Sequence, residues 1–219
     1  MAILFYAIFS YHYSGGSSSG HTRCNPSSFT ARQDLFEKAY NFLIVPGDND
    51  WNECEGYDET KNDGDRRDVW REIFADTTSP FNKFERNFPG ENDFPDIERK
   101  TTPNAQGDMN PELFFFRYND IAIFGLTTPS GDNYINDYSL VNINAEWVAD
   151  RLGDDCTFQS VIFLSHKDPV PAVLDVIDID FAERCNRILP SLIVKGSRHP
   201  VNYCMDHDED LKRTELTVE

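Results

Sequence analysis

The chain has 219 residues, of which 38 are acidic and 20 basic, and its net charge is -18 at neutral pH. This imbalance excludes a nucleic-acid-binding surface, which needs a basic face to neutralise phosphates. It also argues against binding to anionic membrane surfaces. A hydrophobic content of 39% is sufficient for the core of one large domain or two small ones. The acidic surface favours solubility and attracts cations.

The first 28 residues differ in composition from the rest of the chain. The apolar start, Met1 to Phe9, is too short to span a bilayer and lacks the basic beginning of a signal peptide. A Gly/Ser run at residues 15–20 follows and is typical of a flexible linker. We therefore expect a start and linker over residues 1–28, a folded domain over 29–205 and an acidic, charged tail over 206–219. No other window is apolar enough for a membrane span. The compartment stays open, with a secreted or extracytoplasmic setting favoured over the cytoplasm.

Apolar periodicity predicts strands that alternate with helices. In chain order the predicted elements are a helix (29–40), a strand (41–45), a helical turn (68–74), an irregular excursion (77–111), a hairpin (112–118 and 121–126), a helix (142–152), a strand (160–164), a helix (180–189) and a strand (192–194). This alternation predicts an α/β (α+β) layered fold. On the helix 142–152, Trp147 is expected to pack against a sheet as a core residue.

The most informative segment begins with the apolar run Leu43 to Val45, which stops abruptly at Pro46 and Gly47. Asp48, Asn49 and Asp50 follow directly. Ligand sites in α/β sheets lie at the carboxyl ends of strands, so these oxygen-bearing side chains are placed where a divalent cation or a phosphate could bind. The alternative is an Asx-rich surface turn, because Asp and Asn suit turns locally.

Two later strands also run into a polar side chain. One strand leads to His166, and the next leads through Lys195 and Gly196 to His199. A single His after a strand is more often structural, but three strand ends of this kind favour a shared site. Imidazole and carboxylate together suit zinc, iron or manganese. We expect Asp48, His166 and His199 to lie within about 8 Å of one another, close enough to share a cation. We also expect their strands to be adjacent in one sheet, with the strand 121–126 in a partner sheet or at the margin.

Four segments together resemble a known family. They are Pro46-Gly47-Asp48-Asn49-Asp50-Trp51-Asn52-Glu53-Cys54, Asn144-Ala145-Glu146-Trp147-Val148, His166-Lys167-Asp168-Pro169 and Gly196-Ser197-Arg198-His199. In this order they are similar to the calcineurin-like metallophosphoesterases, in the subgroup with a Pro-Gly-Asp-Asn-Asp/Glu-Trp-x-x-Cys motif. The resemblance extends over residues 40–205. It implies a four-layer α/β/β/α sandwich and a two-metal site of the iron, zinc or manganese class that hydrolyses a phosphoester substrate.

The resemblance also implies roles for individual residues. Asp48, His166 and His199 match metal ligands of the family. Asn49 takes the position of the catalytic His, and Asp50 would orient its neighbours from outside the ligand shell.

The sequence departs from the family pattern near its start. The family carries Asp-x-His on a first strand and Gly-Asp on a second, whereas the only acidic residues before Asp48 are Asp34 and Glu37, both in the predicted helix. Tyr11 to Gly16, which includes His12, falls where the subgroup has His-x-Gly-Asp. We therefore expect an N-terminally incomplete member of this fold that holds a single cation and has reduced activity. The alternative is a non-catalytic acidic metal- or protein-binding module derived from that fold.

The five cysteines are Cys24, Cys54, Cys156, Cys185 and Cys204, and none are in CxxC spacing. A structural zinc site is therefore not expected. Cys24 and Cys54 flank the first predicted helix and strand. A disulfide between them would stiffen the loop that follows Asp48, and it is our prediction for the oxidised chain.

Overall fold

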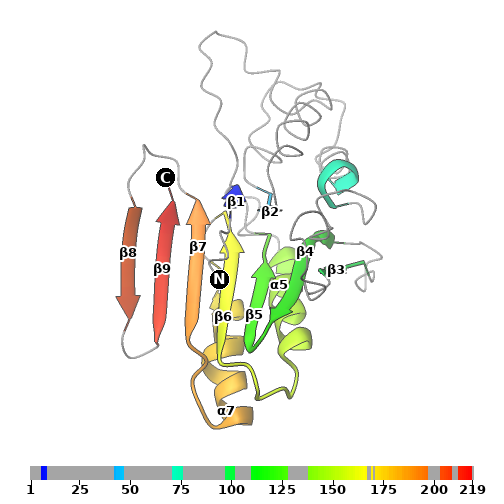
Figure 1. Ribbon diagram of the computed structural model, residues 1–219. Coiled ribbons are helices and arrows are strands. Elements are labelled where there is room, and N and C mark those ends of the chain that lie inside the picture. The colour runs from blue at the N-terminus through cyan, green and yellow to red at the C-terminus, as the bar shows by residue number, and fades with distance from the viewer. Residues whose placement is uncertain are drawn as a thin grey trace, which may run out of the picture.

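A computed structural model describes residues 6–8, 42–46, 71–75, 97–101, 110–127, 138–166, 169, 171–196, 203–208 and 212–218. Its largest feature is a mixed seven-stranded sheet in the order β3-β4-β5-β6-β7-β9-β8 (Figure 1). The strands are β3 (Glu98–Lys100), β4 (Asn110–Tyr118), β5 (Ile121–Gly125), β6 (Ser160–Ser165), β7 (Ser191–Gly196), β8 (Tyr203–Asp208) and β9 (Arg213–Val218). The α/β class predicted from the sequence is therefore correct.

The four strands β5, β6, β7 and β9 run parallel to one another, and the pairings β3–β4, β4–β5 and β8–β9 are antiparallel. The hairpin β4–β5 turns at Asn119 and Asp120, as predicted, and Asn119 has a positive φ of 51°. Asn tolerates this left-handed conformation better than most residues. Parallel strands end at the same edge of a sheet, so the residues that follow β5, β6 and β7 come together there.

The helices between residues 138 and 185 lie over one face of the sheet (Figure 1). The helix α5 (Tyr138–Leu152) packs the buried side chains Ile143, Trp147, Val148 and Leu152 against that face. A second helical segment, formed by α6 (Pro171–Asp175), η5 (Val176–Asp180) and α7 (Phe181–Cys185), covers the same face through Val173, Ile177 and Phe181. Trp147 is 2% exposed, so its predicted place in the core is confirmed. None of the helices described is long and apolar enough to cross a bilayer.

The opposite face of the sheet is also apolar. Phe114, Phe116, Ile123 and Leu164 are buried there, and Ile162 and Val194 are partly buried against them. Val45 packs into this cluster and directly follows β2 (Phe42–Ile44), which pairs in parallel with β1 (Tyr6–Ile8) in a separate two-stranded sheet. Figure 1 draws β1 and β2 beside the upper ends of β5 and β6. Both faces of the central sheet are therefore apolar, one packed against helices and the other including Val45 in its buried cluster.

Several predicted elements differ from the structure. The last predicted helix was expected at residues 180–189, but helical structure runs from Pro171 and ends before Asn186, whose φ of 52° is left-handed. A left-handed residue after the last turn is a common helix terminator. β3 lies inside the excursion expected to be irregular. The segment 68–74, predicted as a helical turn, overlaps η2 (Arg71–Ala75), a single π-helical turn. The helix predicted at 29–40 lies outside the described residues.

The C-terminal segment forms two strands where only a charged tail was expected. β9 is inserted between β7 and β8, and it pairs with β7 in parallel over six residues. In Arg213 to Val218 the strand period is visible only at the end, where the apolar Leu216 and Val218 alternate with the polar Glu215 and Thr217. The many charges of residues 206–219 hid this alternation. The largely buried charge of Arg213 is compensated by an ion pair with Asp178 of η5.

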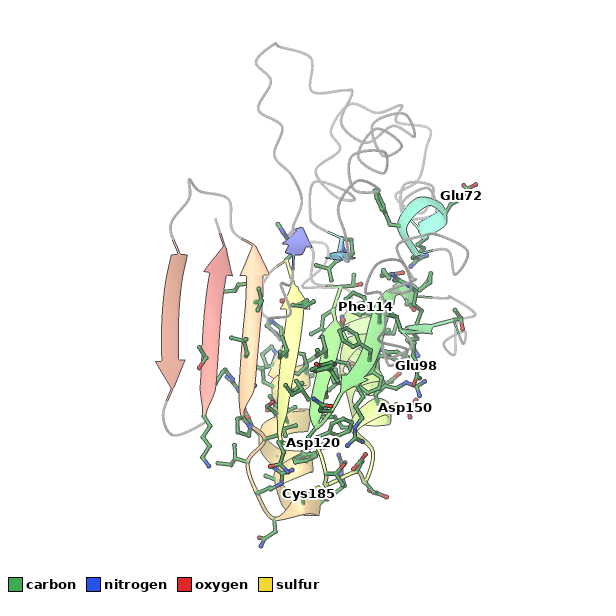
Figure 2. The ribbon with its side chains drawn as sticks, viewed as in Figure 1. Glu72, Glu98, Phe114, Asp120, Asp150 and Cys185 are labelled. Carbon is green, nitrogen blue, oxygen red and sulfur yellow. A yellow bond between two sulfur atoms is a disulfide. The ribbon has the colours of Figure 1, made fainter. Side chains whose placement is uncertain are left out.

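A disulfide joins Cys156 to Cys185, with their Cα atoms 5.4 Å apart. It ties the loop after α5 to the last residue of α7. Cys185 lies near the lower end of the sheet, close to the turn that contains Asp120 (Figure 2). This bridge was not predicted, and the predicted pair, Cys24 and Cys54, lies outside the described residues.

Candidate functional site

The candidate site is the sheet edge at which the parallel strands end. Phe114, Gly125, Leu164 and Val194 form one row across β4, β5, β6 and β7 in the observed register. The same register continued by two residues reaches Glu112, Thr127, His166 and Gly196. The hydrogen bond from the Leu126 amide to the Leu164 carbonyl, at 2.9 Å, shows that β5 stays beside β6 past its last paired residue. Neighbouring strands are about 4.8 Å apart, so this edge row spans about 15 Å.

His166 is the one predicted metal ligand that lies within the described residues. It directly follows β6 and is 4% exposed, and its neighbour Ser165 is fully buried. If the alternation of β6 is continued one residue past Ser165, it assigns His166 to the face of Leu164, away from the helices. A buried imidazole at the carboxyl end of a parallel strand is well placed to accept a metal ion or to hold a polar partner.

The remaining predicted site residues, Asp48, Asn49, Asp50 and His199, lie outside the described residues. Their attachment points are described. Val45, three residues before Asp48, packs in the same cluster as Leu164, two residues before His166. Gly196, three residues before His199, ends β7, which pairs directly with β6. The segments that lead to the three predicted ligands therefore start near the same edge of the sheet, where β6 and β7 end.

The strand arrangement differs from the one expected. β6 and β7 are adjacent, as predicted, but β2 belongs to the separate sheet with β1. The strand at 121–126 was expected in a partner sheet or at the margin, whereas β5 pairs directly with β6. The hydrophobic pattern alone could not separate these cases, because buried strands of either sheet are similar apolar runs. Within the described part of the chain, no group of three or more His, Cys, Asp or Glu side chains could hold a metal ion.

A polar clamp fixes the end of β5 beside His166. The side-chain oxygen of Asn144, on α5, accepts a hydrogen bond from the Thr127 amide at 3.0 Å, and its Nδ2 donates to the Thr127 carbonyl at 3.0 Å. Both residues are 1% exposed. A buried backbone amide and carbonyl without such partners would each carry a desolvation cost of about 1–3 kcal/mol. Asn144 therefore gives both backbone groups of Thr127 a hydrogen-bond partner.

A second polar contact lies at the first residues of β4. Glu112 is fully buried and receives two hydrogen bonds from Arg71 of η2, Nε to Oε2 at 2.8 Å and Nη2 to Oε1 at 2.8 Å. This bidentate geometry is the strongest form of arginine–carboxylate pairing. Asn110 Nδ2 lies 3.4 Å from Glu112 Oε1. The ion pair anchors η2, and with it the buried side chain of Phe74, at the candidate edge.

Arg99 brings a further positive charge to Glu112. Its guanidinium donates to the Pro111 carbonyl at 2.7 Å and lies 5.6 Å from the centre of the Phe114 ring. Loss of hydration on burial lowers the pKa of Arg99 to about 10, and the charge of Glu112 opposes that shift. Arg99 stays protonated at neutral pH, so Glu112 faces two cationic side chains.

Two of these features were missed in the sequence, although each left a signal. Glu112 directly precedes the apolar run Leu113 to Phe116, and an acid next to such a buried run needs a buried partner. Asn144 lies between Ile143 and the Trp147–Val148 pair on the apolar side of a helix. An amide on that side needs hydrogen-bond partners from another element.

Comparisons of the chain with protein-family models, with curated proteins and with solved structures found no match.

Proposed function

We propose that this chain is a metal-dependent phosphoester hydrolase of the calcineurin-like type with reduced activity, whose site forms at the edge described above. Asp48, His166 and His199 would hold a divalent cation of the iron, zinc or manganese class. Asn49 would contact the substrate, and Asp50 would orient the ligand loop. The cation would polarise a phosphoester bond and lower the pKa of a bound water.

The observation that carries the proposal is the common origin of the three ligand-bearing segments. His166 is buried at the end of β6, β7 ends next to it, and Val45 packs beside Leu164. A cation held by these residues would lie outside the carboxyl ends of parallel strands, the usual place for a site in an α/β protein. The resemblance of the motifs supports the choice of chemistry.

We also propose that the fold is the four-layer α/β/β/α sandwich. Helices on one face and an apolar cluster on the other are what a sheet in the interior of such a sandwich requires. The place of Val45 in the same buried cluster as Phe114, Phe116 and Leu164 supports the β1–β2 sheet as part of the second β layer.

The proposal of reduced activity rests on the ligand count. Two cations side by side repel each other unless a carboxylate bridges them, and the residues before Asp48 offer only Asp34 and Glu37. One Asp and two His residues suit one cation. His12, four residues after β1, is the nearest His to the end of that strand. It could supply a further nitrogen ligand, but not a bridging carboxylate.

The proposal is tested by metal binding and turnover of the full chain. Isothermal titration with Zn²⁺ and Mn²⁺ should detect one bound cation, and binding should be lost in Asp48→Ala and His166→Gln. His207→Gln is the matched control, because β8 runs antiparallel to β9 and places residue 207 toward the opposite edge. Hydrolysis of an aryl phosphate and an aryl phosphodiester should be slow, metal-dependent and abolished in Asp48→Ala.

The outcomes separate the two candidate functions. Cation binding that needs Asp48 and His166 but is accompanied by no hydrolysis would favour the non-catalytic alternative, which the acidic surface of 38 Asp and Glu residues also suits. Cation binding that is unchanged in both variants would refute the metal site. Fast turnover abolished in Asp48→Ala would refute the claim of reduced activity, and a His12→Ala variant would then test the N-terminal segment.

A further inference from the structure

We infer that Asn144 is a positioning residue for the candidate site, and that it acts on His166 through the backbone of Thr127. This inference deepens the proposed function and rests on it for the nature of the ligand. Asn144 touches neither substrate nor metal in this assignment.

The first step is the location of the clamp. β5 and β6 pair in parallel with a constant offset of 39 residues, from Ile121 with Ser160 to Gly125 with Leu164. The same offset carries Thr127 to His166, and the Leu126–Leu164 hydrogen bond of 2.9 Å supports this continuation. The residue that Asn144 holds is therefore the strand neighbour of the proposed metal ligand.

The second step is the type of contact. Asn144 binds both the amide and the carbonyl of Thr127, each at 3.0 Å, so the peptide units on either side of Thr127 are fixed. A side chain with only one of these functions would leave one unit free to turn. Because Thr127 and Asn144 are 1% exposed and His166 is 4% exposed, water has little access to replace the lost bond.

The third step is the rigidity of the support. Asn144 sits on α5 beside Ile143, Trp147 and Val148, which are buried against the sheet. The Trp147 ring is in turn covered by the Arg151 guanidinium, 4.3 Å from its centre. The packed helix α5 therefore fixes the side-chain amide of Asn144, and this amide in turn fixes the backbone of Thr127 at the sheet edge. Groups outside the ligand shell that orient a metal-bound His typically change metal affinity by about 10- to 100-fold when they are removed.

The test compares Asn144→Leu, which removes both hydrogen bonds at similar volume, with Asn144→Asp, which keeps only an acceptor for the Thr127 amide. The matched control is Arg187→Met, which removes side-chain bonds to the Cys156 and Phe158 carbonyls at the opposite edge. The direct readout is the ¹H–¹⁵N spectrum of the His166 ring without metal, assigned through His166→Gln. The second readout is the Zn²⁺ dissociation constant of the full chain.

We expect the His166 ring signals to shift or broaden in both Asn144 variants and to stay unchanged in Arg187→Met. Zn²⁺ affinity should fall about 10-fold in Asn144→Leu, at the low end of the range for indirect positioning. His166 signals unchanged in a folded Asn144 variant would overturn the inference. Failure of the wild-type chain to bind Zn²⁺ would instead refute the proposed function, because the ring spectrum does not depend on metal. If Asn144→Leu does not fold, Asn144→Asp carries the same two readouts.

Discussion

The clearest energetic prediction concerns the Cys156–Cys185 disulfide. The bridge closes a loop with a sequence separation of 29. In the chain-entropy account, a loop of this size removes about 12 cal/mol/K from the unfolded state, which corresponds to about 3.6 kcal/mol at 25 °C. For a chain of this length each kcal/mol corresponds to roughly 2–4 °C in Tm. We therefore expect the disulfide to raise the Tm by about 7–14 °C.

The measurement is calorimetric melting of the oxidised chain against Cys156→Ser, Cys185→Ser and the double variant. Each single change breaks the crosslink completely, so all three variants should melt within about 2 °C of one another, apart from the small packing change at partly buried Cys185. Cys204→Ser is the control for removing a cysteine outside this pair. Peptide mapping of the oxidised protein should recover the linked fragments.

Two results would refute this reasoning. A Tm loss below about 2 °C in the double variant would mean that the unfolded loop is already compact and the bridge constrains little. Losses that add between the two single variants would mean that each cysteine stabilises the fold by packing. Disulfides form and persist in oxidising compartments, so a linked peptide in protein from its natural source would favour the secreted or extracytoplasmic setting.

Three further predictions follow from single contacts. Gly125→Ala should destabilise the fold by about 1–3 kcal/mol in chemical denaturation, because an added Cβ would lie 2.1 Å from Cε1 of Phe114; Phe114→Leu should restore part of the loss, and simple addition of the two effects would contradict the steric account. Glu112→Gln should lower the unfolding free energy by about 3 kcal/mol or more in the same measurement, because it leaves the charges of Arg71 and Arg99 without a buried counter-charge. A loss below about 1 kcal/mol would mean that solvent already screens the Arg71–Glu112 pair. Hydrogen bonds from the Thr157 side chain and amide, and then from Arg117, lower the pKa of Asp155 below its usual 3.8. The ionised carboxylate therefore stabilises the fold above pH 3.8, and this contribution is lost as the pH falls through the lower pKa of the folded state. The difference in unfolding free energy between wild type and Asp155→Asn, measured by urea unfolding at several pH values, should narrow on acidification, and a difference that widens would reverse the assignment.

The parts of the fold that the sequence predicted are those that depend on local patterns. β6, β7 and the β4–β5 hairpin are short apolar runs bounded by turn residues, and their bounds were close to those observed. The helix at Asn142 to Leu152 was predicted from its apolar stripe, although α5 begins earlier, at Tyr138. In these segments the local sequence pattern and the tertiary packing favour the same secondary structure, so the pattern alone was sufficient to predict it.

The parts that were missed depend on partners distant in sequence. β3 is three residues long, and all three are charged. Each contacts a distant side chain: Glu98 pairs with Arg151, Arg99 lies against Phe114 and Lys100 lies over the Trp147 ring. β9 inserts beside β7 although β8 comes first in the chain, and strand order of this kind is not encoded in periodicity. The Cys156–Cys185 bridge likewise joins two segments whose proximity follows from the packing of α5 and α7 on one face.

For the candidate site, the sequence supplied the residue types and the strand ends, and the structure supplied the supports. His166 was selected because it follows an apolar strand, and the structure places it, buried, directly after β6. The polar contacts at the same edge, Asn144 with Thr127 and Arg71 with Glu112, join residues 17 and 41 positions apart in sequence. No short motif could have contained them.

The supports of the two ends of the sheet differ in kind, and this difference has a functional consequence. At the candidate edge, order depends on polar contacts such as the Asn144 clamp and the Arg71–Glu112 pair, which are sensitive to substitution and to charge. At the opposite end, the loop 154–158 is held by a covalent bond, by Arg187 on the Cys156 carbonyl at 2.9 Å and by Arg117 on Asp155 at 2.6 Å. Reduction of the disulfide should therefore lower the global stability while leaving the His166 environment of the folded chain unchanged. Substitution of Asn144 should have the opposite pattern. It should change the His166 ring signals clearly while it lowers the global stability less than reduction of the disulfide does.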